Sequence, residues 1–204
     1  MEMANAVLIS IRPAWVEKIA NGRKTIEVRK TKPYLETPFK CYIYCTNTRP
    51  FLVWGDVFRG DWCTEFTRLS GYGRAEADRI WDVFNGHVAG EFTCDRITPL
   101  FNVCTDNWHH LAGDVHEWHK ELIKRACLTD AELKAYAKGQ NCFAWHISDL
   151  KIYDTPKPLS AFKGLCKIDV GCGECPYYNY TKMDCDGRTI KRPPQSWCYV
   201  EELK

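Results

Sequence analysis

The sequence has no uninterrupted run of about 18 apolar residues, which is the minimum for a transmembrane helix, so we expect no membrane partner. Residues 1–11 lack the basic and apolar regions of a signal peptide, and we therefore expect a cytoplasmic protein. The net charge is only +2 over 204 residues, which argues against the broad basic surface of a duplex-binding protein. The sequence also lacks the internal repeats that would indicate a solenoid.

Twelve cysteines are unusual for such a chain, because a reducing compartment argues against a disulfide framework. Seven are scattered over the first 142 residues. In the predicted strand 39–45, Cys41, Ile43 and Cys45 alternate and share one face. We interpret the scattered cysteines as small apolar residues of the core. They are Cys41, Cys45, Cys63, Cys94, Cys104, Cys127 and Cys142.

The other five cysteines crowd into a segment that is poor in aliphatic residues and rich in Gly, Pro and charge. A Cys-x-x-Cys turn flanked by glycines lets two thiolates approach one tetrahedral ion, and the metal supplies folding free energy that such a segment lacks. We predict a structural zinc held by four of the five. A loop of unligated thiols and a redox dithiol stay as alternatives. The five are Cys166, Cys172, Cys175, Cys185 and Cys198.

Many short strands and few helices predict an α+β fold built on a small mixed β-barrel with flanking helices. We divide the chain into a domain at 1–158 and a cysteine-rich, zinc-stapled extension at 159–204 that packs on the barrel. The expected helices are one that begins at Pro13 and ends at Asn21-Gly22, then 74–84, 114–127, and one after the capping box of Thr129 and Glu132. The expected strands are 7–11, 25–29, 39–45, 51–58, 87–103, 142–153 and 196–201.

The segment 22–29 contains the pattern Gly-x-Lys-x-x-Glu-x-Arg. On a strand, Thr25, Glu27 and Arg29 lie on one face, opposite Ile26 and Val28, with Lys24 at the entry. A lysine, a carboxylate and an arginine so close together can present donors and an acceptor to a base or a phosphate. A solvated charged face is the competing interpretation.

The residues from Leu8 through Arg12-Pro13 and Trp15, followed by the 22–29 motif, resemble the start of the ASCH domain family, a branch of the PUA-like superfamily. The strands near Glu91 and at 143–148 look like the closing strands of that family. The resemblance covers roughly residues 5–155 and leaves the cysteine-rich tail outside. It implies a barrel with a cleft lined by Lys24, Glu27 and Arg29, and an association with RNA or modified nucleosides.

Some small members of this family hydrolyse N4-acetylcytidine with a Lys-x-x-Thr pattern and a second Glu. Here Lys24 is retained, Glu27 stands at the threonine position, and Thr25 lies in another register. Glu91 and Glu121 are both candidates for the second Glu. The absent hydroxyl weakens the amidohydrolase interpretation, although Glu27 could act as a base toward water with Lys24 or Arg29 beside the oxyanion.

Our first hypothesis is a cytoplasmic module that binds RNA, a nucleotide or a modified nucleoside. The alternatives are a nucleoside amidohydrolase or ribonuclease that uses Lys24 and Glu27 in the same cleft, and an adaptor that contacts a protein partner through its cysteine-rich segment. His146 is expected to be a structural histidine. The predicted ligand-binding residues are Arg12, Lys24, Thr25, Glu27, Arg29, Tyr44 and Glu91.

Overall fold

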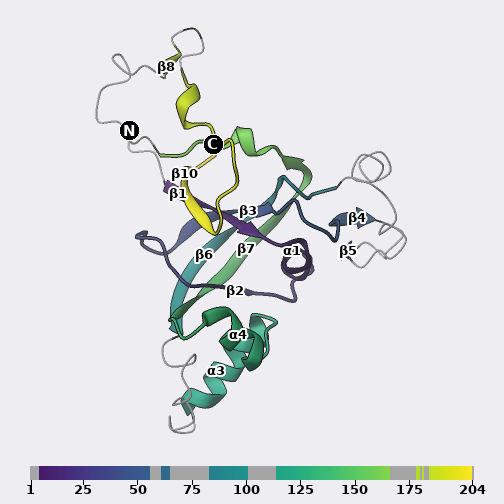
Figure 1. The fold of residues 1–204 in the computed structure, drawn as a ribbon, viewed down its shortest axis with the longest axis vertical. Helices are drawn as coiled ribbons and strands as arrows, with labels where there is room; N and C mark the ends of the chain where they lie inside the picture. Colours follow the sequence, from purple (N-terminus) through teal and green to yellow (C-terminus); the bar gives the residue numbers. More distant parts are fainter. Residues whose placement is uncertain are drawn as a thin grey trace.

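The structure is a computed structural model that describes residues 5–55, 61–64, 83–100, 114–165, 178–179, 181 and 184–203. Its centre is a six-stranded mixed sheet with the order β10-β1-β3-β6-β7-β2 (Figure 1). β1 and β3 run parallel, and the other neighbouring pairs in this sheet are antiparallel. The strands are β1 (Asn5–Ile11), β2 (Ile26–Arg29), β3 (Phe39–Cys45), β6 (Val88–Leu100), β7 (Cys142–Lys157) and β10 (Trp197–Glu201).

Strict alternation along the strands divides the core between the two faces of the sheet. Val7 and Ile9 of β1 pack with Cys41 and Ile43 of β3 in one buried cluster. The intervening residues of both strands belong to a second cluster, which includes Phe162. The predicted shared face of Cys41, Ile43 and Cys45 is confirmed. Among the other scattered cysteines that the structure describes, Cys94 and Cys142 are buried, whereas Cys63 and Cys127 are half-buried.

Helix α1 (Pro13–Ala20) packs against the first of these clusters. Pro13 occupies the first helical turn, where its missing N–H costs no hydrogen bond. Val16 and Ile19 are fully buried beneath the helix. The chain leaves the helix through Gly22, whose φ of +70° explains the glycine at this turn. The predicted helix and its end are therefore confirmed.

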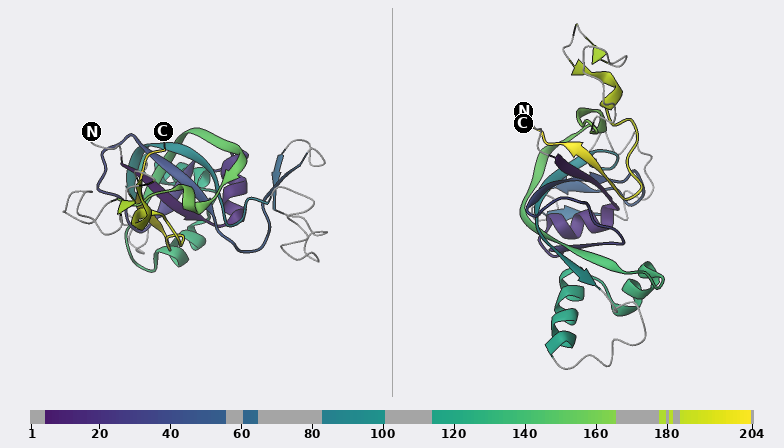
Figure 2. Two further views of the ribbon diagram at one scale, coloured as in Figure 1. Left: turned by 90° about the horizontal axis from the view of Figure 1, so that it is seen from above. Right: turned by 90° about the vertical axis from the view of Figure 1, so that its left-hand side faces the viewer.

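Helices α3 (Asp114–Arg125) and α4 (Asp130–Ala137) lie at the end of the molecule opposite β8 (Tyr178–Asn179) and the short helix η6 (Asp186–Arg188) (Figure 2). Their apolar residues form a third cluster with Ile26 and Val28 of β2. The predicted capping box is present, because Thr129 and Glu132 exchange hydrogen bonds at the start of α4. α4 ends at Ala137, followed by Lys138 and Gly139 with positive φ.

Three expected elements lie partly beyond the described residues, and one of them, the strand expected at 87–103, is seen as β6. The strand expected at 51–58 is seen as β4 (Val53–Gly55), which pairs with β5 (Asp61–Cys63). Of the helix expected at 74–84, only 83–84 are described, and Val83 forms an isolated bridge with Val53. The remaining elements are η4 (Leu159–Ala161) and β9 (Asp184–Cys185).

The α+β class and a barrel-like mixed sheet are confirmed in this structure. β10 completes the sheet beside β1, with Ala6 opposite Val200, while the domain boundary after residue 158 stays a prediction. In the ranges given above, no helix is long and apolar enough to cross a membrane.

Candidate functional site

Lys24, which precedes β2, forms a buried row of charges with Glu27 and Arg29 on that strand. The Nζ atom of Lys24 lies 3.3 Å from Oε2 of Glu27, and Nε of Arg29 lies 3.1 Å from Oε1. The exposed fractions of the three side chains are 3%, 10% and 10%. Burying three charges is costly unless they are paired. These three are both buried and paired, so they do not form the solvated charged face of the competing interpretation.

The ammonium group of Lys24 is anchored by the connection after α3. Its Nζ donates to the carbonyl oxygen of Ala126 at 2.9 Å. Next to it, the backbone N–H of Thr25 donates to the carbonyl of Arg125, and Nε of Arg125 donates to Oγ1 of Thr25. Carbonyls at the end of a helix attract cations, which explains why a buried lysine ends here.

The guanidinium group of Arg29 spans the gap between β2, at one edge of the sheet, and the opposite edge, where β1 and β10 lie. We call this gap the seam. One terminal nitrogen donates to the carbonyl oxygen of Ser10 at 2.6 Å, and the other lies 3.4 Å from Oγ of Ser196. Its Nε is fully buried beside Glu27. Because these donors face the protein itself, Arg29 holds the seam and positions Glu27.

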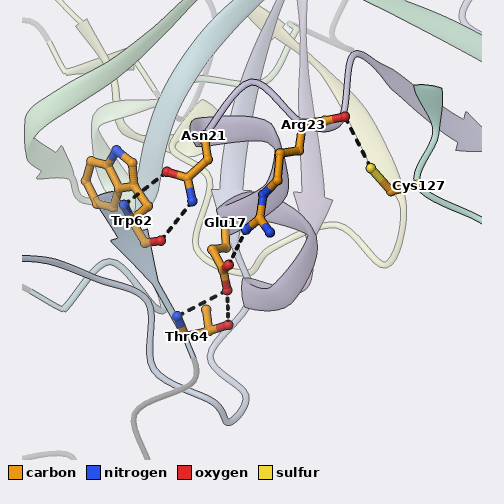
Figure 3. A network of polar contacts seen from close by, with 6 residues as sticks. All are labelled: Glu17, Asn21, Arg23, Trp62, Thr64 and Cys127. Carbon is orange, nitrogen blue, oxygen red and sulfur yellow. Dashed lines mark hydrogen bonds and ion pairs between the residues drawn. The ribbon is translucent and has the colours of Figure 1, made fainter. Parts of the chain in front are cut away.

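A second polar network fixes the turn that leads into the motif (Figure 3). Glu17 of α1 accepts hydrogen bonds from the backbone N–H and the hydroxyl of Thr64 and pairs with Arg23 at 2.5 Å. Asn21 exchanges two hydrogen bonds with the backbone of Trp62. The thiol of Cys127 donates to the carbonyl of Arg23. The residues on both sides of Gly22 are thus tied down, and this fixes the entry of Lys24.

The three charged residues open into a cleft of about 670 Å³. Its walls come from α1 and the end of β1, from α4, and from the segment before β10. The lining residues are Ser10, Ile11, Arg12, Trp15, Lys24, Glu27, Val28, Arg29, Tyr44, Thr46, Asn47, Leu128, Glu132, Tyr136, Pro193, Pro194 and Gln195.

Lysine ammonium groups lie over two aromatic rings of this cleft. Trp15 is half-buried, with Nζ of Lys18 and Nζ of Lys24 at 4.4 and 5.1 Å from its ring. Tyr136 of α4 is 40% exposed, and Nζ of Lys30 lies 5.5 Å from its ring. Cation–π contacts hold these side chains while leaving part of their apolar surface in the cleft.

The wall at 193–195 was missed by the sequence interpretation, which placed no ligand contact in the tail. The hydroxyl of Ser10 donates to the carbonyl of Pro194 at 2.6 Å, and the N–H of Ser10 donates to the carbonyl of Ser196. Ser10 is 8% exposed. No local sequence signal predicts a contact between residues so far apart in the chain, so only the fold reveals it.

The structure brings five of the seven predicted ligand-binding residues into one cleft: Arg12, Lys24, Glu27, Arg29 and Tyr44. Thr25 lies outside its lining and holds the loop to α3. Glu91 lies elsewhere on β6, where Oε1 is 3.7 Å from Nζ of Lys40 and Oε2 accepts a 2.5 Å hydrogen bond from Tyr153. Burial, and then this hydrogen bond, raise the pKa of Tyr153, so the phenol remains the donor. Ligand binding by these seven residues stays a prediction.

The predicted zinc site falls mostly outside the described residues, because Cys166, Cys172 and Cys175 lie there. Cys185 is buried in β9, and Cys198 is half-buried in β10 opposite Leu8. Within the described part of the chain, no group of three or more His, Cys, Asp or Glu residues lies close enough to hold a metal ion. The zinc-stapled segment thus gains no support there.

Comparisons with known proteins place the fold. No protein-family model matches the chain, and no curated protein sequence matches it. Solved structures do match the chain, and they show that its fold is ASCH-like. The crystal structure of ASCH from Zymomonas mobilis covers 97% of this chain and 88% of that chain, with a TM-score of 0.50 and 17% identity.

Two variants of the same bacterial protein also match at 17% identity. A serine-to-alanine variant has a TM-score of 0.51 and a tyrosine-to-phenylalanine variant one of 0.50, and 89% and 91% of those chains are covered. At this identity the likeness shows the fold alone. It agrees with the family resemblance of residues 8–29 at the level of architecture.

Proposed function

We propose that the cleft binds a nucleotide, a modified nucleoside or a short stretch of single-stranded RNA. The observation that carries the proposal is the buried row of Lys24, Glu27 and Arg29 at the edge of an aromatic-lined cleft. Its volume of about 670 Å³ lies in the usual range for small-molecule sites. Aromatic faces stack bases, while a carboxylate and an ammonium group read their polar edges.

Charge near the cleft mouth supports a phosphorylated ligand. Arg12 lines the cleft and is exposed, and the exposed Arg192 directly precedes the wall residue Pro193. Glu132 is the acidic residue on the α4 side. A guanidinium group binds phosphate oxygens in a bidentate manner, so Arg12 is suited to contact a 5′-phosphate.

Incubation of the protein with a library of nucleosides, nucleotides and short RNAs, followed by mass analysis of retained and released compounds, tests this proposal. We expect retained compounds to contain a base, and retention to be lost in Lys24→Ala. Lys151→Ala serves as the matched control, because Lys151 is exposed on β7 and outside the cleft. Failure of the folded protein to retain any compound, or equal retention by both variants, would contradict the proposal.

The contact between Lys24 and Glu27 also favours a second candidate, hydrolysis of an acylated nucleoside. Glu27 would take a proton from water, the resulting hydroxide would attack the acyl carbon, and Lys24 would stabilise the oxyanion before the amine leaves with that proton. Arg29 is less suited to the oxyanion, because its donors face Ser10, Ser196 and Glu27. Products of the same incubations report this activity, and Glu27→Gln should abolish it; an unchanged rate would sink the mechanism.

We further propose a structural zinc in the cysteine-rich segment, and a cytoplasmic location for the protein. Both rest on the sequence. The Cys-x-x-Cys turn at Cys172 and Cys175, in a segment poor in aliphatic residues, carries the first.

A further inference from the structure

The order of polar atoms along the charged row favours one base over the others, an inference that rests on the nucleotide-binding function proposed above. Nε of Arg29 lies against Oε1 of Glu27, and Nζ of Lys24 lies against Oε2. The two cations are therefore at opposite ends of the carboxylate. Along the row the atoms are a guanidinium nitrogen, two carboxylate oxygens and an ammonium nitrogen.

Only part of this row can bind a ligand. Nε of Arg29 is fully buried, and the terminal nitrogens of this residue face Ser10 and Ser196. A carboxylate at neutral pH only accepts hydrogen bonds, and each oxygen has more than one lone pair. An ammonium group has three hydrogens; Lys24 directs one at Ala126 and pairs with Oε2 of Glu27, which leaves one for a ligand. The row thus offers an acceptor, a second acceptor and then a donor.

The complement of such a row is a ligand edge that reads donor, donor, acceptor. Guanine has this edge in its 2-amino group, its N1–H and its O6. Cytosine reads donor, acceptor, acceptor, uracil reads acceptor, donor, acceptor, and adenine has one amino donor beside a ring acceptor. None of these three edges has two adjacent donors, so each leaves at least one oxygen of the Glu27 carboxylate without a donor or places an acceptor against it. Unmatched polar groups in a buried site are the usual basis of strong discrimination.

We propose that the cleft is specific for guanine nucleotides, with Glu27 accepting from the 2-amino group and N1–H and Lys24 donating to O6. The phosphate then lies toward Arg12 at the cleft mouth. Pterins share the same polar edge but carry no ribose phosphate. A guanine nucleotide is favoured because the cleft also contains this exposed arginine.

Titration calorimetry with GMP, IMP, AMP, CMP, UMP and a pterin tests the proposal. IMP differs from GMP only in lacking the 2-amino group, so it removes one hydrogen bond to a charged acceptor. We expect GMP to bind at least about tenfold more tightly than IMP, and more tightly still than AMP, CMP and UMP. Glu27→Gln should abolish the difference between GMP and IMP. Glu36→Gln, at an exposed position outside the cleft, should retain it.

The outcomes separate this inference from the function on which it rests. Equal affinity for all five nucleotides, or for GMP and IMP, would overturn guanine specificity while leaving a nucleotide-binding cleft. Tighter binding of the pterin than of GMP would overturn the assignment to a nucleotide. No binding of these compounds by protein whose circular dichroism shows it folded would overturn guanine specificity, and failure of the wider library of nucleosides and RNAs as well would overturn the function on which it rests. A tenfold preference for GMP that persists in Glu27→Gln would overturn the role of the carboxylate.

Discussion

Arg29 donates to the carbonyl oxygen of Ser10 across 2.6 Å, although the two residues lie on strands that share no backbone ladder. Ser10 in turn donates its hydroxyl to Pro194 and its N–H to Ser196. One backbone position therefore connects the charged row to the C-terminal wall of the cleft. The seam of the sheet is closed by side chains, and this is where the cleft lies.

Replacement of Arg29 by methionine should strongly destabilise the fold. Removing one member of a buried ion pair leaves Glu27 with less compensation and typically costs about 3 kcal/mol or more. Urea denaturation measures the change in unfolding free energy. Arg12→Met is the matched control, because Arg12 is exposed and such substitutions usually change stability by less than about 0.5 kcal/mol. Equal effects of the two variants would contradict the seam-holding role.

Ser10→Ala should weaken the attachment of the wall at Pro194. The loss of one partly buried hydrogen bond is expected to cost about 1 kcal/mol of unfolding free energy and to lower affinity for whichever nucleotide binds best. Ser196→Ala should have a smaller effect, because its hydroxyl lies at the longer distance of 3.4 Å from Arg29. Calorimetry and denaturation of both variants give the comparison. A larger loss in Ser196→Ala would show that the wall is held differently.

His146 should make the protein sensitive to acid. Burial, reinforced by the nearby Arg96 and Arg125, lowers its pKa to about 4. Since Arg96 can only donate, Nδ1 of His146 is an acceptor, and Nε2–H donates to Oγ1 of Thr98. The expected structural role of this histidine agrees with these contacts.

Because the native pKa lies below the ordinary value of about 6.5, the contribution of neutral His146 is complete above pH 6.5. It is lost as the pH falls toward 4, with a maximum of about 3 kcal/mol. Denaturation midpoints of the protein and His146→Gln from pH 7.5 to 4 measure the difference. The stability of the variant should fall less steeply over that range, and parallel curves would refute the assignment.

Gly90→Ala should disrupt the pairing of β6 with β7. A Cβ at this position would lie 2.4 Å from the backbone carbonyl oxygen of Lys151, which cannot move without shifting the strand. We expect a loss of more than about 2 kcal/mol, or failure to fold. At Gly139 no atom of the described residues lies within 4 Å of such a Cβ, but φ is +75°, so Gly139→Ala should cost only about 1 kcal/mol. Thermal denaturation of both variants checks the order.

The proposed zinc predicts one metal ion per chain in protein purified without added metal, as measured by mass spectrometry of the metal content. The double variant Cys172→Ser, Cys175→Ser should lose the metal and unfold at lower temperature. Cys127→Ser should keep it, because Cys127 lies outside the cysteine-rich segment. Absence of stoichiometric zinc, or unchanged stability of the double variant, would refute the proposal.

Sequence patterns predicted the parts of the fold that depend on interactions between residues close together in the chain. The alternation of Ile26 and Val28 correctly indicated a strand with one apolar face, and these side chains pack against α3 and α4. Thr129 and Glu132 form the predicted capping box. The same pattern could not show that Arg29 and Lys24 are buried as well, because their partners Ser10 and Ala126 come from other parts of the chain.

The walls of the candidate site show which contacts cannot be predicted from a single sequence. Trp15 was named only among the residues that carry the family resemblance, yet it lines the cleft beside Lys24. Tyr136 and Gln195 line it from two further segments. Glu91, chosen from a family resemblance, pairs with Lys40 and Tyr153 instead. Contacts of this kind are decided by topology, which spacing along the chain does not encode.

The bond between Ser10 and Pro194 joins residues 184 positions apart. During synthesis, β1 therefore leaves the ribosome long before the residues that complete the cleft beside it. Such non-local pairing is among the slower events of folding. A chain still being translated has no finished cleft, so ligand binding begins only once the segment through β10 has emerged, and a proteolytic cut before Pro193 would remove the cleft wall even if the charged row remained.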